Sequence, residues 1–420
     1  RKNYMNIPIA KPSLGQDEAE AASKVILSGW VTQGAKVEEF EKAFASYVGS
    51  EFACAVSSCT AALHIALLAV GVKPGDVVIT VSHSFIASAN AIRHCGAEPV
   101  FIDIDPETFN MSLSTLEKCL YDECENIDES LVYRNISDLA RGESPLVNMI
   151  NKGSETCKLG RVSAVMPVHQ MGMPCDLNEI IKLTQKFKIP VVGDAACAVG
   201  SEVKFNNSWD KIGKPHESIA CFSFHPRKVL TTGDGGMLTT NNPSYDRQFK
   251  LLRQHAMSIP DTERHNAKKM IFEEYLTTAF NYRMTDIQAA VGIEQLKKIP
   301  EMIQSRRAID KLYRKLLKDI KWLRLPVQPV YARSNWQSYP ARVRPDAPVS
   351  RNELMQYLMD NGVSSRPGIM NAHQEKPYSK HNYELPESDK ARDEVILFPI
   401  YKGLEENDVK VISDLIHKIG

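Results

Sequence analysis

The sequence predicts an α/β protein with a large, mostly parallel sheet, followed by a smaller C-terminal domain. Short β-branched runs alternate with segments of helix length, which is the pattern of strand–helix–strand units. The strand-like runs are almost continuously apolar, as expected where helices cover both faces of a sheet. Near residue 290 the pattern changes to a long helical stretch and then to shorter mixed elements.

The individual elements follow from composition and periodicity. The runs most typical of buried strands are 52–56, 77–81, 99–103, 162–168, 190–194 and 237–240. Apolar side chains recur at helical spacing over 177–187, after an Asp176 that can cap the helix. Further helical patterns cover 61–72 and the stretch after Asp286. Strands and helices therefore alternate, as the connections of a parallel sheet require.

The length of 420 residues indicates more than one domain, and we divide the chain where the pattern changes. Residues 1–290 form the predicted large α/β domain, and residues 291–420 form the small C-terminal domain. Residues 120–160 are polar with weak periodicity, and we interpret them as an inserted, partly helical segment at the surface. Such an insertion could shape a substrate entrance or a subunit interface.

Composition excludes several classes of function. Lys and Arg number 51, as do Asp and Glu, and this zero net charge argues against a nucleic-acid-binding protein and a cationic membrane binder. No stretch approaches the roughly 18 apolar residues that a membrane helix needs. The nine cysteines form no CxxC pair and no cluster with zinc spacing. We therefore predict no metal site and a reducing compartment, the cytoplasm.

Two residues stand where an α/β sheet places its chemistry. Asp194 ends an apolar strand, and a carboxylate in that solvent-poor position needs a cationic partner. Taken alone, it could equally cap the turn that follows. Lys228 lies between an apolar strand and the glycine-rich residues 233–236. A lysine in a partly apolar pocket has a lowered pKa and can form a Schiff base, although most lysines between strands are simply solvated.

A phosphate site and a stacking ring are predicted on the same sheet. Residues 57–60 are small or carry hydroxyls and open a helix directly after a strand, where free N–H groups bind anions. Ser223 can donate a hydrogen bond to the same phosphate. Phe85 stands at a strand-to-helix turn, where its ring could stack on a flat heterocycle. The ordinary alternatives are that residues 57–60 only cap the helix and that Phe85 is an aromatic residue of the core.

These features together match one cofactor, pyridoxal 5′-phosphate. It needs a cradle for the phosphate, a stacking ring, a carboxylate that keeps the pyridinium nitrogen protonated, and a lysine for the aldehyde. The chain supplies the four groups on one predicted sheet.

Several motifs together resemble the DegT/DnrJ/EryC1/StrS family of sugar aminotransferases, which have the aspartate aminotransferase (type I) fold. The similarity extends from about Ile7 to the end of the chain. The motifs that carry it are SGWVTQGAKVEEFEKAFASYVG, the block from SSCTAALHIALLAVGV to AEPVFIDID, MPVHQMGMPCDL, VVGDAAC, SFHPRKVLTTGDGGM and FNYRMTDIQAAVGIEQL. The resemblance implies a large domain with a mostly parallel, seven-stranded sheet between helices and a smaller α+β domain.

The resemblance assigns roles around the cofactor ring. Lys228 binds the aldehyde, Asp194 pairs with the pyridine nitrogen, and Phe85 stacks on the ring. The family often has Glu-Asp-Ala-Ala-Gln where this chain has residues 193–197, and the Gln usually faces the phenolic oxygen. Cys197 takes its place here, and a thiol is a poor hydrogen bonder.

The resemblance also assigns the phosphate contacts. The backbone at Cys59 and Thr60 holds the phosphate, together with the hydroxyls of Thr60 and Ser223. Asn281, in the motif FNYR, matches an asparagine that reaches the phosphate of the neighbouring subunit. This match implies a homodimer with shared active sites.

Five further residues are candidates for the substrate side. Trp30 and Thr32 match a segment that lines the sugar pocket, and His169 matches a position near the cofactor whose tautomer is open. Arg283 and Arg366 are candidate anion contacts for the donor carboxylate or the substrate, with a surface ion pair as the alternative for Arg366.

The implied reaction moves an amino group from an amino acid, expected to be L-glutamate, to a keto-sugar. The expected acceptor is a nucleotide-linked 3- or 4-keto-6-deoxyhexose for cell-surface polysaccharide, including lipopolysaccharide, or for natural products. A first alternative is a sugar without a nucleotide, such as an oxidised 3-deoxy-octulosonate or a cyclitol. A second is a non-catalytic regulatory protein on the same fold. The related dehydratases replace the lysine, so Lys228 argues against them, and no GxGxxG or Walker loop supports a generic nucleotide-binding protein.

Overall fold

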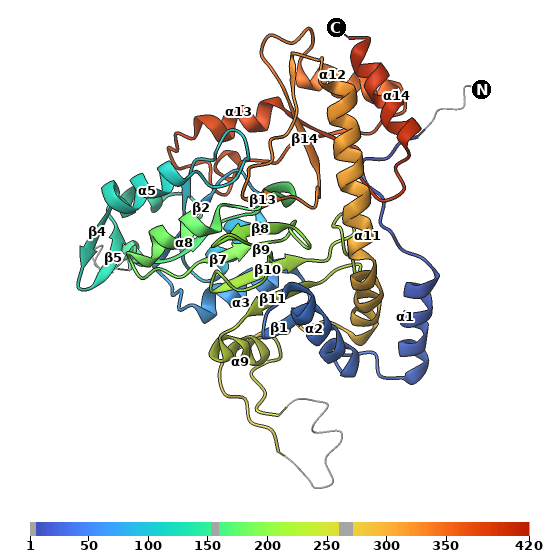
Figure 1. The fold of residues 1–420 in the computed structure, drawn as a ribbon. Helices are drawn as coiled ribbons and strands as arrows, with labels where there is room; N and C mark the ends of the chain where they lie inside the picture. The colour runs from blue at the N-terminus through green and yellow to red at the C-terminus, as the bar shows by residue number, and fades with distance from the viewer. Residues whose placement is uncertain (1–5, 153–158, 260–271, 420) are drawn as a thin grey trace.

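The computed structural model describes residues 6–152, 159–259 and 272–419. A large mixed sheet with its covering helices forms most of the molecule, and the C-terminal elements pack together at one end of it (Figure 1). The long helix α11 (Asp286–Leu317) runs along one side and connects the two parts.

The large sheet contains seven strands in the order β1-β11-β10-β7-β6-β2-β3. Their bounds are β1 (Phe52–Val56), β2 (Val77–Val81), β3 (Glu98–Ile102), β6 (Val162–Met166), β7 (Val192–Asp194), β10 (Ile219–Ser223) and β11 (Gly236–Thr240). Parallel bridges Val165–Val191 and Val168–Asp194 join β6 to β7. Only β11 is antiparallel to its neighbours, β1 and β10. The predicted mostly parallel, seven-stranded sheet is therefore confirmed.

Helices on both faces explain why the strands are apolar throughout. The helices associated with this sheet are α2 (Ala35–Val48), α3 (Cys59–Ala69), α4 (Ala87–His94), α5 (Leu113–Asp122), α8 (Leu177–Gln185) and α9 (Pro243–Leu252). In β1, Ala53 and Ala55 belong to the core cluster that contains α2, whereas Cys54 and Val56 belong to the cluster that contains α3. Because successive strand residues face opposite sides, a strand buried on both faces shows no polar alternation.

The C-terminal elements surround a second core. An antiparallel sheet in the order β12-β14-β16-β15 is covered by α12 (Arg351–Asp360), α13 (Pro386–Glu394) and α14 (Glu406–His417). The strands are β12 (Leu323–Arg324), β14 (Tyr339–Val343), β15 (Arg366–Pro367) and β16 (Val395–Phe398). Helix α11 packs residues up to Ile303 in the large core and residues from Ile309 onward in the second core. The predicted boundary at 290–291 falls inside this helix, and the division into domains stays a prediction.

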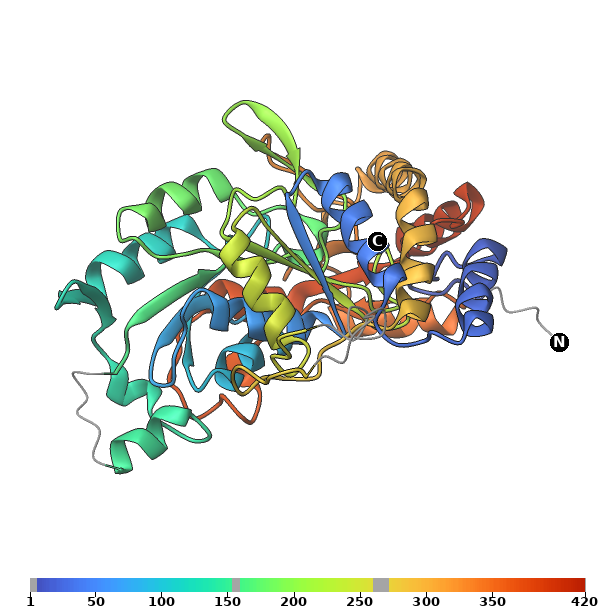
Figure 2. The ribbon, with the colours of Figure 1, turned by 90° about the horizontal axis from the view of Figure 1, so that it is seen from below.

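The segment predicted as an insertion is folded in its described part. It contains the hairpin β4 (Cys124–Ile127) and β5 (Ser130–Tyr133) and the helices α6 (Ile136–Leu139) and α7 (Pro145–Asn151), while 153–158 lie outside the described residues. Leu131, Leu139 and Leu146 are buried in the large core, so its few apolar residues anchor it there. It lies at the end of the molecule away from α11 (Figure 2).

The remaining elements are short or peripheral. Helix α1 (Gln16–Ser28) lies against α11 (Figure 1), and β13 (Ala332–Arg333) extends the hairpin β8 (Glu202–Phe205) and β9 (Ser208–Lys211). Two 3-10 turns, η2 (Gln170–Gly172) and η3 (Ala372–Gln374), complete the elements used below. No helix within the described residues is long and apolar enough to cross a membrane.

Candidate active site

Asp194 is the last residue of β7, and only 4% of it is exposed. Its Oδ2 accepts a hydrogen bond of 2.7 Å from the Ser88 hydroxyl, and its Oδ1 accepts one of 3.1 Å from the backbone N–H of Ala196. Burial raises the pKa of the Asp194 carboxyl, although both hydrogen bonds and the charge of Lys228 oppose this effect. The site thus holds a buried carboxylate suited to a cationic partner.

Lys228 lies in the loop that follows β10, the strand beside β7. Its Nζ lies 3.1 Å from the Sγ of Cys197, in the turn after β7. Burial lowers the pKa of Lys228, but Cys197, Cys59 and Asp194 outweigh it, and the pKa is raised. The expectation of a lowered pKa is therefore wrong, because it took account of the apolar pocket and left out these partners.

Two amide side chains from the C-terminal half hold the loops of Cys197 and Lys228. The Gln337 Oε1 accepts a hydrogen bond of 2.9 Å from the backbone N–H of Val229. The Asn335 Nδ2 donates a hydrogen bond of 2.8 Å to the carbonyl of Cys197. Sequence reasoning missed both residues, because SNWQS has no periodicity that separates a buried amide from a surface one.

The N-terminus of α3 forms the predicted phosphate cradle. Ser58 caps the helix, since its Oγ accepts a hydrogen bond of 3.1 Å from the backbone N–H of Ala61. Cys59 and Thr60 are the first two residues of the helix, and no described residue accepts a hydrogen bond from their backbone N–H groups. A helix end of this kind suits an anion.

A glycine brings Ser223 to this cradle. Gly236 begins β11 and pairs with Ser223 at the end of β10. A Cβ at Gly236 would lie 2.6 Å from the carbonyl carbon and oxygen of Ser58, so only glycine allows β11 to pass so close to α3. Ser223 is buried, and its Oγ accepts a hydrogen bond of 3.4 Å from the backbone N–H of His225.

Phe85 lies in the turn between β2 and α4, and 70% of it is exposed. The alternative reading as a core aromatic is therefore wrong. An exposed apolar ring on the segment that also carries Ser88, the partner of Asp194, is suited to stacking on a flat ligand.

His169 is fully buried beside the strand end that carries Asp194. Its backbone N–H donates a hydrogen bond of 3.0 Å to the carbonyl of Asp194. Its Nδ1 accepts a hydrogen bond of 3.0 Å from the backbone N–H of Cys175, which places the ring proton on Nε2. The Nε2 has no partner among the described residues, and burial lowers the pKa of His169 to about 3. His169 is thus a neutral donor with one unused N–H.

Trp30, Thr32 and Asn281 lie in two connected segments. The Gln33 Nε2 donates a hydrogen bond of 3.0 Å to the Oε1 of Gln254, and Gln254 pairs with Asn281 in an isolated bridge. The carbonyl of Thr32 accepts a hydrogen bond of 3.1 Å from the backbone N–H of Asp286. Trp30 is half-buried, whereas Thr32 and Asn281 are exposed.

The two candidate arginines lie in different surroundings. Arg283 is half-buried and pairs with Val56, directly before the residues that open α3. Arg366 is exposed on β15 and pairs with Leu397 in the C-terminal sheet. Among the described contacts, none joins Arg366 to the group around Lys228.

The residues fit pyridoxal phosphate at its ring nitrogen, aldehyde, ring face and phosphate. The carboxylate of Asp194, the amine of Lys228, the exposed ring of Phe85 and the α3 N-terminus gather at the ends of β2, β7, β10 and β1. No three His, Cys, Asp or Glu in the described ranges lie together as a metal site.

The chain is similar to known aminotransferases over almost its whole length. The model of the DegT/DnrJ/EryC1/StrS aminotransferase family matches residues 12–127 and 149–417. The spore coat polysaccharide biosynthesis protein SpsC of Bacillus subtilis is 31% identical over 425 residues, covering 100% of this chain and 98% of SpsC. The aminotransferase TlmJ of Streptoalloteichus hindustanus superposes with a TM-score of 0.81 at 28% identity, over 98% of both chains. A DegT DnrJ EryC1 StrS aminotransferase from Brucella abortus superposes with a TM-score of 0.77 at 26% identity, over 96% of this chain and 95% of the other.

Proposed function

The chain belongs to the DegT/DnrJ/EryC1/StrS family of pyridoxal phosphate-dependent sugar aminotransferases, and from this premise we propose its donor and its acceptor. The donor is L-glutamate, and the acceptor is a nucleotide-linked 3- or 4-keto-6-deoxyhexose. The amino sugar serves a cell-surface polysaccharide, lipopolysaccharide included, or a natural product. The similarity to SpsC, a spore coat polysaccharide biosynthesis protein, supports the first of these uses. We place the reaction in the cytoplasm, which agrees with the eight free cysteines among the described residues.

The observation that carries the proposal is that Asp194 and Lys228 lie at the ends of neighbouring parallel strands, Asp194 as the last residue of β7 and Lys228 in the loop after β10. Asp194 pairs with Cys221 in the register of β7 and β10, and Lys228 follows on the loop after β10. An amine and a buried carboxylate at adjacent strand ends are what amino-group transfer with this cofactor requires.

Bound pyridoxal phosphate supplies an aldehyde that takes up an amine and a ring that draws electrons from the neighbouring carbon. Asp194 holds the proton on the ring nitrogen. Lys228 would act as the base that removes the proton from Cα of the donor and as the acid that returns it to the C4′ carbon. In the second half of the reaction, Lys228 moves the proton in the opposite direction. Phe85 covers one face of the ring and excludes water from it.

The remaining groups bind and orient. The backbone of Cys59 and Thr60 and the hydroxyls of Thr60 and Ser223 hold the phosphate. Cys197 would take the place of the glutamine near the phenolic oxygen, and His169 would have an Nε2–H free to donate to the cofactor. Of the two candidate arginines, Arg283 is the better anion contact, because it lies beside the N-terminus of α3. Arg366 has no described contact with the residues around Lys228.

We further propose a homodimer in which Asn281 reaches the phosphate in the partner subunit, while Trp30 and Thr32 line the sugar pocket. In the described part of the segment after α9, Tyr275 and Leu276 are 62% and 58% exposed. Exposed apolar residues a few positions before the exposed Asn281 support contact with a second copy.

The experiment is an amine-transfer assay with purified protein, pyridoxal phosphate and L-glutamate. The acceptors are a nucleotide-linked 3-keto-6-deoxyhexose, the 4-keto isomer and an oxidised octulosonate, and the readouts are 2-oxoglutarate and the mass of the amino sugar. Amination of a nucleotide-linked sugar, absent in Lys228→Ala, supports the proposal. Amination of the octulosonate alone would replace the proposed acceptor with the first alternative.

A further inference from the structure

A chain of two buried hydroxyls ends on Asp194. The Ser88 Oγ lies 2.7 Å from the Oδ2 of Asp194, and the Ser84 Oγ lies 2.8 Å from the Ser88 Oγ. Ser84 and Ser88 are 4% and 2% exposed, so water does not compete for these bonds. An ionised carboxylate only accepts, so Ser88 donates to Asp194 and accepts from Ser84.

The same short segment carries the exposed ring of Phe85. The backbone N–H of Ser88 donates a hydrogen bond of 3.1 Å to the carbonyl of Phe85, which ties the two residues together. The partner of the carboxylate and the proposed stacking ring are therefore fixed relative to each other by the backbone of one turn.

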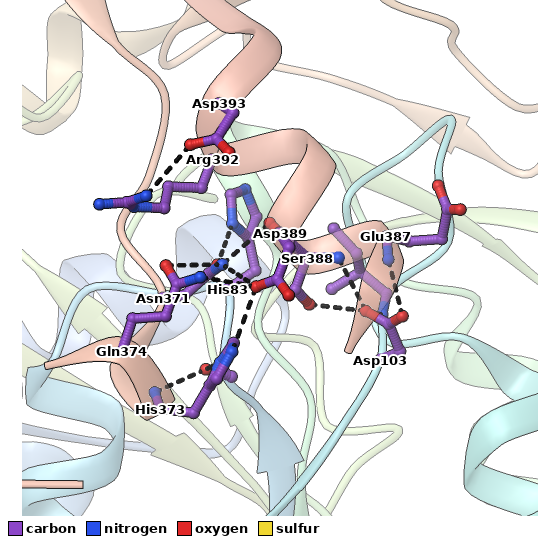
Figure 3. A network of polar contacts seen from close by, with 12 residues as sticks. His83, Asp103, Asn371, His373, Gln374, Glu387, Ser388, Asp389, Arg392 and Asp393 are labelled. Carbon is purple, nitrogen blue, oxygen red and sulfur yellow. Dashed lines mark hydrogen bonds and ion pairs between the residues drawn. The ribbon is translucent and has the colours of Figure 1, made fainter. Parts of the chain in front are cut away.

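The start of this segment is clamped by the C-terminal part of the chain (Figure 3). The His83 Nδ1 lies 2.8 Å from the Oδ1 of Asn371, and the Ser82 Oγ lies 2.7 Å from the Nδ1 of His373. Asp389 in turn accepts hydrogen bonds from Asn371 at 3.2 Å and from Gln374, and it lies 3.2 Å from the Nε2 of His373.

Three further hydrogen bonds in this network hold Asp103, which directly follows β3. The Asp103 Oδ1 accepts hydrogen bonds of 2.7 Å and 2.9 Å from the hydroxyl and the backbone N–H of Ser388, and its Oδ2 accepts one from the backbone N–H of Glu387 (Figure 3). The turn that carries Ser88 thus rests on a framework built from both halves of the chain.

We propose that Ser88 is a positioning residue for Asp194, which holds the carboxylate ionised and in the one orientation that meets the cofactor ring nitrogen. Ser88 touches neither substrate nor reacting atoms in this account, and it acts through Asp194. The bond engages one lone pair of Oδ2 and leaves the carboxylate further lone pairs for the ring nitrogen. A hydrogen bond donated to a carboxylate favours its charged form. This inference rests on the proposed role of Asp194.

The test uses pyridoxal phosphate labelled with ¹⁵N at the ring nitrogen, whose chemical shift reports whether that nitrogen keeps its proton. The variants are Ser88→Ala, Ser88→Thr, which retains the hydroxyl, and Ser84→Ala, which removes the neighbouring hydroxyl but leaves the bond to Asp194. The dissociation constant of the cofactor is measured for each variant. Asp194→Asn is the reference for loss of the carboxylate charge.

For Ser88→Ala we expect a ¹⁵N shift toward the deprotonated ring and about tenfold weaker cofactor binding, the size of one lost hydrogen bond to a charged group. Ser88→Thr should restore both readouts, and Ser84→Ala should stay near the original protein. If Ser88→Ala fails to fold, Ser88→Cys keeps the volume with a weaker donor, and both readouts should move in the same direction. Unchanged shift and binding in Ser88→Ala, or in Ser88→Cys where Ser88→Ala does not fold, overturns the inference, whereas an Asp194→Asn variant with an unchanged shift overturns the role of Asp194 itself.

Discussion

The Nζ of Lys228 lies 3.1 Å from the Sγ of Cys197, and this contact joins the loops that follow two neighbouring strands of the large sheet. It is a property of this chain's own residues, because the family that the chain resembles often has a glutamine at position 197. The contact raises the pKa of Lys228 against the opposing effect of burial.

Replacing Cys197 by Ala should therefore lower the pKa of Lys228 in protein without cofactor. Only the neutral amine attacks an aldehyde, so the midpoint of the pH profile for pyridoxal phosphate capture should move to lower pH. Stopped-flow measurement of the capture rate against pH checks this, with Cys197→Ser as the variant that keeps a polar partner. An unchanged midpoint in Cys197→Ala would show that the thiol does not affect the pKa of Lys228.

Glu217 should make the protein less stable as pH rises. It is 3% exposed, and burial, which outweighs hydrogen bonds from the backbone of Glu217 and His216, raises its pKa to about 7. The unfolded carboxyl titrates near its ordinary value of 4.5. The folded state therefore binds more protons between these values, and stability falls as pH rises through this window.

The shift corresponds to a loss of about 3 kcal/mol between pH 4 and pH 8. Glu217→Gln should remove this loss and be more stable than the original protein above pH 7, with little gain at pH 4. Urea unfolding at both pH values measures the free energy. Glu51→Gln, an exposed carboxyl, is the control. Parallel pH profiles for the original protein and Glu217→Gln would refute the prediction.

Gly236→Ala should weaken phosphate binding. The new Cβ would lie 2.6 Å from the carbonyl of Ser58, so either β11 or the α3 N-terminus has to shift, at a cost of about 1–3 kcal/mol. Equilibrium titration should show roughly tenfold or weaker cofactor binding. In Gly15→Ala the nearest atom to the new Cβ is 3.8 Å away, so that variant should bind as before. Equal affinities in the two variants would contradict the proposed cradle.

Asn371→Ala should destabilise the fold through the framework of Figure 3. The change removes the acceptor of His83, which is fully buried, and a donor to the carbonyl of Ser388. A buried group left unpaired costs about 1–3 kcal/mol. Urea unfolding measures the loss, and Asn352→Ala on the exposed face of α12 should lie within about 0.5 kcal/mol of the original protein. A similar stability for both variants would show that the clamp contributes nothing.

The sheet could be predicted closely, because strands buried on both faces leave an unmistakable apolar run. The runs at 52–56 and 77–81 coincide with β1 and β2. The helix after Asp286 was also predictable. Its full length to Leu317 was not, because a proline such as Pro300 usually ends a helix. The packed hairpin and helices of 124–151 were less evident from the sequence. A few buried apolar residues hold this segment to the core, and its mostly polar composition gives no sign of them.

The contacts that set the site could not be read from the sequence. Ser88 lies 106 residues from Asp194, and Asn335 lies 138 residues from Cys197. Serine and asparagine are common at surfaces, so only the folded chain distinguishes a buried donor from a solvated one. The raised pKa of Lys228 is missed for the same reason, since its partners come from separate loops.

The central claim is that Lys228 is the residue to which the cofactor is bound. Borohydride reduction of the protein loaded with pyridoxal phosphate makes the attachment permanent, and peptide mass spectrometry then identifies the modified residue. The account predicts a single pyridoxyl group on Lys228, and no such group anywhere in Lys228→Ala. A pyridoxyl group on another lysine of the original protein, or none at all, would contradict it.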